Sequence, residues 1–200
     1  MKDKYANFGE LARVEKRGRD FRLRLRRRAA VTVVIAPHGG GIEPGTSEIA
    51  EAIAGANLSF YAFEGRKTKH NAHLHITSTS FDEPRCIALI ASSERVVAIH
   101  GQGGDAEVVL LGGRDEATIR RLRESLRQGG FSVQNTRNPR LEGLAAANIC
   151  NRGTQSAGVQ MELSEGMRRT FFRTLETRRG RETQTPRFRD FVAAVRRVIA

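Results

Sequence analysis

Three apolar runs of this sequence each lead into residues that bind metal ions or transfer protons. These are residues 31–36 followed by His38 and Glu43, residues 95–99 followed by His100, and residues 158–161 followed by Glu162. A catalytic zinc ion takes three nitrogen or oxygen ligands from the protein and leaves one position for water. Two histidines and one glutamate make such a set, so the pattern predicts one zinc ion per chain, held by His38, Glu43 and His100.

The spacing of His38 and Glu43 requires a bend in the backbone. Along a straight strand, residues five apart point to opposite faces, so the two side chains could not reach one ion. Three consecutive glycines, residues 39–41, lie between them. Glycine adopts backbone angles that other residues avoid, so this segment can fold back and bring both side chains together.

Glu162 is the carboxylate that this ligand set leaves over, and it suits a general base. Zinc lowers the pKa of a bound water to about 7. A carboxylate beside that water can take its proton during attack on a carbonyl and return the proton to the leaving amine. The residues alone therefore favour a metal-dependent hydrolase.

Strands and helices alternate along the chain in a way that would place these residues at one edge of a sheet. The predicted strands are residues 21–27, 31–36, 58–63, 73–80, 95–99, 107–111, 131–133 and 158–163, and the predicted helices are residues 46–54, 84–91, 115–128, 188–199 and one capped by Ser164. This pattern is typical of an α/β fold with helices on both faces of a central sheet. Fully apolar runs beside half-polar strands favour an open mixed sheet, in which ligands gather at the carboxyl ends of the strands. We expect a polar N-terminal segment, residues 1–20, and a single α/β domain over residues 21–200.

A net charge of +12 on 200 residues has three interpretations: a basic surface that is only solvated, an anionic substrate, or nucleic acid, since a field of this sign attracts polyanions. The sequence has no RNP-like, zinc-finger or helix-turn-helix pattern and no tryptophan, so it offers basic surface without a device to read bases. A basic nucleic-acid-binding protein without hydrolase activity is the alternative. Its binding would weaken steeply with salt and would not change when a chelator is added. A metal-dependent hydrolase would lose activity with the chelator and respond little to salt.

Cysteine usage and hydropathy exclude further classes. The two cysteines, Cys86 and Cys150, are far apart, so they indicate neither a disulfide framework nor a cysteine zinc site. No apolar run reaches the roughly 20 residues that span a bilayer, and the N-terminus lacks the apolar segment of a signal peptide. We expect a cytoplasmic protein with no membrane partner that is monomeric or weakly associating.

Five motifs together identify a family resemblance. The motifs are PHGGGIEPGTSE, LHITSTSFDEP, AIHG, NICNRG and GVQMELSEGMRR, in this order. The combination resembles the poly-γ-glutamate hydrolase family, whose best-known member is a bacteriophage enzyme that cuts the γ-glutamyl polymer of bacterial capsules, and it covers residues 21–199. A phage-encoded copy would be released by host lysis.

The resemblance implies a zinc-dependent amide hydrolase, a metallopeptidase with an architecture similar to that of the zinc carboxypeptidases. It places the metal ligands at His38, Glu43 and His100 and the catalytic glutamate at Glu162. In the carboxypeptidases the first histidine and glutamate are three residues apart, so that wider likeness is architectural only.

Two more residues in the motifs are candidates for substrate binding. Arg152 could grip a substrate carboxylate through two parallel hydrogen bonds, or serve as a structural arginine in a turn. His75 could contact substrate, form a second metal site with His73 on one strand face, or be structural.

The exact substrate is open, because a fold does not determine it. A zinc amidase that acts on another γ-glutamyl or N-acyl small molecule is a second alternative. The HGGG segment also resembles the oxyanion loop of serine esterases, but the GxSxG nucleophile motif of those enzymes is absent.

Overall fold

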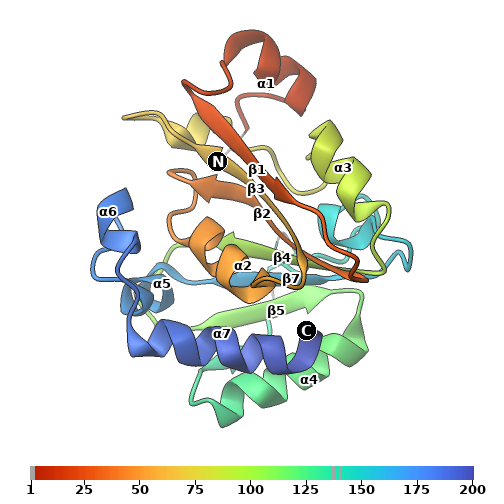
Figure 1. Cartoon of the computed structure of the whole chain (residues 1–200), viewed down its shortest axis with the longest axis vertical. Coiled ribbons are helices and arrows are strands. Elements are labelled where there is room, and N and C mark those ends of the chain that lie inside the picture. Colours follow the sequence, from red (N-terminus) through yellow and green to blue (C-terminus); the bar gives the residue numbers. More distant parts are fainter. Residues whose placement is uncertain (1–2, 137, 140) are drawn as a thin grey trace.

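A computed structural model describes residues 3–136, 138–139 and 141–200 and shows a single α/β domain built on a seven-stranded mixed sheet (Figure 1). The strands are β1 Phe21–Arg26, β2 Thr32–Gly40, β3 Ser59–Gly65, β4 Arg95–Gly101, β5 Val109–Gly113, β6 Val133–Gln134 and β7 Val159–Leu163. Their order is β1-β3-β2-β4-β7-β5-β6. The four central strands β3, β2, β4 and β7 are parallel, while β1 and β5 run antiparallel to their neighbours β3 and β7. The predicted α/β class and mixed sheet are confirmed.

Helices cover both faces of this sheet. The α-helices are α1 Phe8–Val14, α2 Thr46–Ala54, α3 Pro84–Ile90, α4 Glu116–Gln128, α5 Glu165–Phe171, α6 Arg178–Arg181 and α7 Pro186–Ile199, and the 3-10 helices are η1 Asn71–Leu74 and η2 Ile149–Asn151. Helices α2, α4, α5 and α7 bury their apolar sides in one core, with α4 packed beside α7 (Figure 1). Helices α1 and α3 and both 3-10 helices close a second core on the opposite face.

A β-bulge decides which face His38 occupies. In β2, Val34 and Ala36 point into the first core, and strict alternation would send His38 to the same side. Between Ala36 and Gly39, however, β2 advances three positions while β3 advances two, from Ala62 to Glu64. The extra residue turns His38 towards the second face, a common use of bulges beside functional sites.

Most of the helices predicted from sequence are confirmed, as is the predicted cap at Ser164. The helix predicted over residues 46–54 is α2, and Ser164 caps α5 by accepting the backbone N–H of Met167 at 3.1 Å. Asp115 caps α4 in the same manner, and a good cap stabilises a helix by about 1 kcal/mol.

The strand predicted over residues 73–80 is wrong. The segment begins in η1, continues as an irregular stretch and ends in a turn, and it pairs with no strand among the described residues. Leu74 and Ile76 are buried because the segment lies over the second core, so alternating burial there comes from packing and not from sheet pairing. His73 is exposed and stacks on His70 at 5.2 Å, so the second metal site considered for His73 with His75 does not form from one strand face.

The N-terminal segment is part of the folded unit where it is described. Tyr5 and Leu11 are buried in the second core, and α1 was not predicted. The division at residue 21 stays a prediction. Among the described residues, no helix is both long enough and apolar enough to cross a membrane.

Candidate metal centre

The side chains singled out from sequence meet at the carboxyl ends of the central strands. His38 ends β2, His100 ends β4 and Glu162 ends β7, and His100 and Glu162 are register partners. Val96 and Ala98 of β4 point into the second core, so alternation also directs His100 to that face. These residues, with Glu43, line a cavity of about 1240 Å³.

The glycine loop brings Glu43 back onto His38, as predicted. The Glu43 carboxylate Oε1 lies 3.1 Å from His38 Nδ1, and the backbone N–H of Glu43 donates to the His38 carbonyl at 2.9 Å. Gly40 has a φ of 65°, a conformation that favours glycine. At Gly39 a Cβ atom would lie 2.0 Å from Ser47 Oγ, so α2 can approach the strand only because that side chain is absent.

His38 presents an unprotonated nitrogen to its neighbours when it is neutral. Its Nε2–H donates to the carbonyl of Ile76 at 2.8 Å, which leaves the lone pair on Nδ1. That Nδ1 faces both Glu43 and His100, whose own Nδ1 is 3.2 Å away. Buried acceptors facing one another repel unless a proton or a metal ion lies between them.

The neighbouring strand β4 holds the Glu43 carboxylate in place. The backbone N–H of Gly101 donates to its Oε2 at 2.8 Å, and His100 Nδ1 lies 3.8 Å from the same oxygen. The carboxylate therefore spans the two histidines, with one oxygen near each. Hydrogen bonds of this kind fix the orientation of a metal ligand before the metal arrives.

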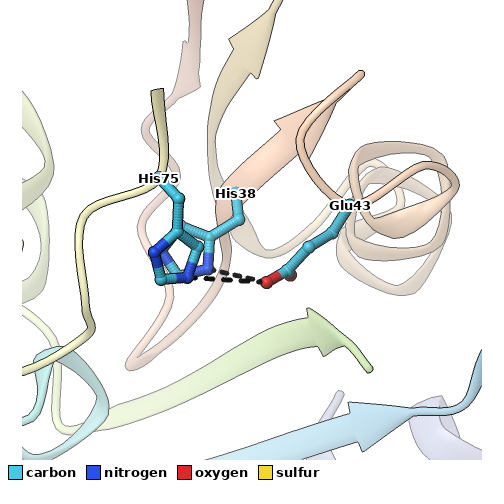
Figure 2. Close-up of side chains that lie close together, drawn as sticks. All are labelled: His38, Glu43 and His75. Carbon is cyan, nitrogen blue, oxygen red and sulfur yellow. Dashed lines mark hydrogen bonds and ion pairs between the residues drawn. The ribbon is translucent and has the colours of Figure 1, made fainter. Parts of the chain in front are cut away.

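His75 joins this group although its segment is not a strand. Potential ligand atoms of His38, Glu43 and His75 all lie within 4.8 Å of one another (Figure 2). The Nδ1–H of His75 donates to Asp3 at 2.7 Å, so its Nε2 carries the lone pair and faces Glu43 Oε1 at 3.9 Å. The His38 and His75 rings stack with centroids 4.0 Å apart.

Burial and mutual charge shift the pKa values of the metal-binding candidates. Burial lowers the pKa of His38, but the Glu43 carboxylate outweighs it and the pKa is raised. Burial raises the pKa of Glu43, yet His38 and His100 bring it down to about 2. Burial lowers the pKa of His100 to about 3, with the charge of His38 adding to the effect. Burial and the same charge lower the pKa of His75.

Glu162 shows the opposite behaviour to Glu43. Its side chain is buried at the cavity, and burial together with the charge of Glu43 raises its pKa to about 8. Gln160 Nε2 donates to its Oε1 at 3.0 Å. Two carboxyls of one cavity thus differ widely in pKa, because their surroundings differ.

Arg152 lies apart from this cluster. It is exposed, its guanidinium donates to the carbonyl of Phe81 at 3.2 Å, and it is not among the residues lining the cavity. Its predicted role in substrate binding stays a prediction. Over the described lining, Lys4 supplies the one lysine or arginine cation, so the basic charge of the chain lies mostly elsewhere.

Three contributors to the site were not found from sequence. Asp3 is 72 residues from His75, and no local pattern could have indicated that pairing. Arg168 is buried and donates to the carbonyls of Pro44 and Gln102, which ties the loops after β2 and β4 together. Gln160 lies two positions before Glu162, so strand alternation could have revealed it.

The arrangement can hold a divalent cation. Two imidazole nitrogens and a carboxylate converge on one region, and hydrogen bonds from Ile76 and Gly101 orient His38 and Glu43. Nitrogen and oxygen donors in this proportion suit zinc, and Glu162 lies in the same cavity to move a proton.

Comparison with known proteins places this chain in a family. The model of the poly-gamma-glutamate hydrolase family matches residues 5–194. The UPF0714 protein YndL of Bacillus subtilis is 35% identical over 199 residues, which cover 98% of this chain and 78% of YndL. The SPbeta prophage-derived UPF0714 protein YoqZ of the same organism is 34% identical over 98% of this chain and 72% of its own length.

Solved structures agree with the sequence comparison. A bacteriophage poly-gamma-glutamate hydrolase superposes with a TM-score of 0.94 at 29% identity, over 98% of this chain and 96% of the phage protein. A structure described as zinc-free YNDL-apo gives a TM-score of 0.93 at 34% identity, covering 98% of this chain and 97% of its own. With these matches over nearly its whole length, the chain belongs to the poly-γ-glutamate hydrolase family.

Proposed function

We propose that this protein is a zinc-dependent amide hydrolase that cleaves γ-glutamyl bonds of poly-γ-glutamate or related acidic peptides. The observation that carries the proposal is the convergence of His38, Glu43 and His100 beside Glu162 in one cavity. Family membership supports the substrate class.

The donor set fits zinc on its own chemistry. In the neutral state His38 turns a lone pair towards Glu43, an arrangement that is stable only with a cation or a proton between the two atoms. The relative described as zinc-free, YNDL-apo, also points to zinc, because its description names that metal for a protein of closely similar fold.

His38, Glu43 and His100 are the proposed ligands of one zinc ion, with His75 left free. His100 Nδ1 is 3.2 Å from His38 Nδ1, whereas His75 Nε2 lies 3.9 Å from Glu43 Oε1 and its side chain is one-third exposed. A fourth protein ligand would close the position that a catalytic ion keeps for water. His75 therefore serves the substrate.

Zinc, when bound, polarises a carbonyl and makes water easier to deprotonate. Glu162 performs the proton transfer: its carboxylate takes a proton from the attacking water and returns it to the nitrogen of the amine that leaves the γ-glutamyl group. Gln160 donates to one Glu162 oxygen, which leaves the other to exchange the proton.

A row of hydroxyl side chains in the cavity binds the carboxylates of the substrate. Thr77, Ser78, Thr79 and Ser80 follow one another along the cavity, and Lys4 adds a positive charge. The net charge of +12 raises the concentration of an anionic polymer near the protein without requiring arginines inside the cavity. Arg152, if it binds the polymer, does so outside the described lining.

The test combines metal content with hydrolysis. Protein purified without a histidine tag is analysed for zinc and assayed on poly-γ-glutamate with and without a chelator. We expect about one zinc per chain in the wild type and loss of both zinc and activity in His38→Ala. His73→Ala is the matched control, because His73 is exposed and stacks on His70 away from the cluster.

Other outcomes separate the alternatives. Zinc with no action on poly-γ-glutamate, but chelator-sensitive cleavage of another γ-glutamyl or N-acyl compound, would keep the mechanism and change the substrate. Failure to take up zinc on reconstitution would remove the mechanism, and salt-sensitive binding of nucleic acid would then favour the basic-surface alternative. A cytoplasmic or lysis-released location and a monomeric or weakly associating state remain predictions.

A further inference from the structure

A directed chain of side-chain amides ends at Glu162. Gln160 and Glu162 lie two positions apart on β7, so their side chains point to the same face of the sheet. Gln160 Nε2 donates to Glu162 Oε1 at 3.0 Å, and Gln160 Oε1 accepts from Asn148 Nδ2 at 2.7 Å. Gln160 is 2% and Asn148 4% exposed, so water cannot readily replace these partners.

The direction of this chain is set at its far end. The backbone N–H of Cys150 donates to Asn148 Oδ1 at 3.1 Å, which makes the other Asn148 atom, Nδ2, the donor towards Gln160. A donor on that side requires the Gln160 oxygen to face it, so the Gln160 NH₂ group must face Glu162. The donor and acceptor pattern thus fixes both amide orientations.

The same region contains a second network that holds a wall of the cavity. Gln160 Nε2 also donates to the Leu141 carbonyl at 3.2 Å, and Asn151 Nδ2 donates to the carbonyls of Gly143 and Ala145 at 2.7 and 2.9 Å. Leu141, Gly143 and Ala145 all line the cavity. The Asn151 oxygen accepts from the Gly158 N–H, so Asn151 supports the wall while Gln160 joins the wall to Glu162.

We propose that Gln160 is a positioning residue for hydrolysis. By binding Oε1 of Glu162, it sets the carboxylate so that Oε2 is the oxygen that exchanges a proton with the reacting water, and Asn148 keeps Gln160 in the donating orientation. This inference rests on the proposed function, since Gln160 acts only through Glu162.

The test separates turnover from substrate binding. Gln160→Met keeps the length of the side chain but removes the donor. We expect its kcat on poly-γ-glutamate to fall about tenfold to a hundredfold with KM changed less than about twofold, in line with loss of one hydrogen bond to the carboxylate form of Glu162 that acts as the base. Zinc content and the circular dichroism spectrum should match the wild type, because Gln160 touches none of the proposed ligands in the described contacts.

Asn151→Ala is the matched control. It loosens the same wall but leaves the Gln160 donor in place, so KM should rise with a smaller loss of kcat. If Gln160→Met shows the same KM-dominated pattern as Asn151→Ala, Gln160 is only a support for the wall and the proposal is wrong.

Asn148→Asp gives a second, independent variant. It replaces the NH₂ that faces Gln160 with an oxygen, so the Gln160 amide should turn round and present its own oxygen to Glu162. We expect a kcat loss like that of Gln160→Met and no further loss in the double variant, because both changes break one chain. Losses that multiply in the double variant would overturn the proposal.

The outcome for Glu162→Gln distinguishes a failure of this inference from a failure of the proposed function. If Glu162→Gln is inactive while Gln160→Met keeps full kcat, only the positioning role fails. If Glu162→Gln keeps full activity, the assignment of the base fails first.

Discussion

His100 and Glu162 are register partners on the neighbouring parallel strands β4 and β7. Their side chains point to the same face, at a separation set by the spacing of about 4.8 Å between paired strands. The proposed third ligand and the proposed base therefore sit on rigid backbone. His38 and Glu43, by contrast, come together through a loop, which backbone and side-chain hydrogen bonds and two glycines hold in shape.

Replacing the base should abolish turnover and leave the metal site intact. Glu162→Gln keeps the shape and the Gln160 contact region but cannot accept a proton, so kcat should fall by about 10² to 10⁴. Zinc content measured by elemental analysis should stay at the wild-type level. A variant with wild-type kcat would contradict the assignment.

The two flanking histidines should separate metal binding from substrate binding. His100→Ala should lose zinc, because its Nδ1 lies 3.2 Å from that of His38 and is one of the three proposed ligand atoms. His75→Ala should keep zinc and raise KM for poly-γ-glutamate. Titration with a competing chelator measures the zinc affinity of both variants. The reverse pattern would make His75 the ligand, a choice that its closeness to His38 and Glu43 permits.

The close approach of α2 to the bulged strand can be tested at Gly39. Gly39→Ala places a Cβ atom 2.0 Å from Ser47 Oγ, and such overpacking should lower the free energy of unfolding by about 1 to 3 kcal/mol. Zinc affinity should fall as well, because the strain lies next to His38. Ser47→Ala should rescue part of the loss, so the double variant is more stable than Gly39→Ala alone in urea denaturation.

Glu15 should make stability depend on pH in the acid range. Burial raises the pKa of Glu15, but hydrogen bonds from Lys67 and Tyr5 outweigh this and hold the pKa below its ordinary value of 4.5. A depressed pKa means that the unfolded chain binds the proton more readily, so this stabilisation is complete above pH 4.5 and is lost as the pH falls through the lowered value.

Glu15→Gln should therefore have a lower free energy of unfolding than wild type at pH 7. This difference, the stability gap, should shrink below pH 4.5. Urea denaturation of the metal-free proteins at several pH values measures the gap. Glu10→Gln is a suitable control, since Glu10 is exposed on α1. A gap for Glu15→Gln that is independent of pH would show that its carboxylate charge contributes nothing.

The sequence determined the fold class and the set of groups that could do chemistry. Buried strands and amphipathic helices have local signatures, so α2 and α4 appear within a residue of their predicted positions. The candidates His38, Glu43, His100 and Glu162 were visible because each follows an apolar run, and parallel strands end at one edge of a sheet.

Tertiary structure decided what alternation and spacing could not. Strict alternation sends His38 to the wrong face, and only the pairing of β2 with β3 reveals the bulge that corrects it. The segment of residues 73–80 alternates like a strand, but it pairs with no strand in the described part of the chain and instead carries His75 over the site. Asp3 reaches His75, and Asn148 reaches Gln160, across separations for which a single sequence contains no signal. Chemistry at a site depends on contacts between distant segments, and those exist only once the sheet and its covering loops have packed.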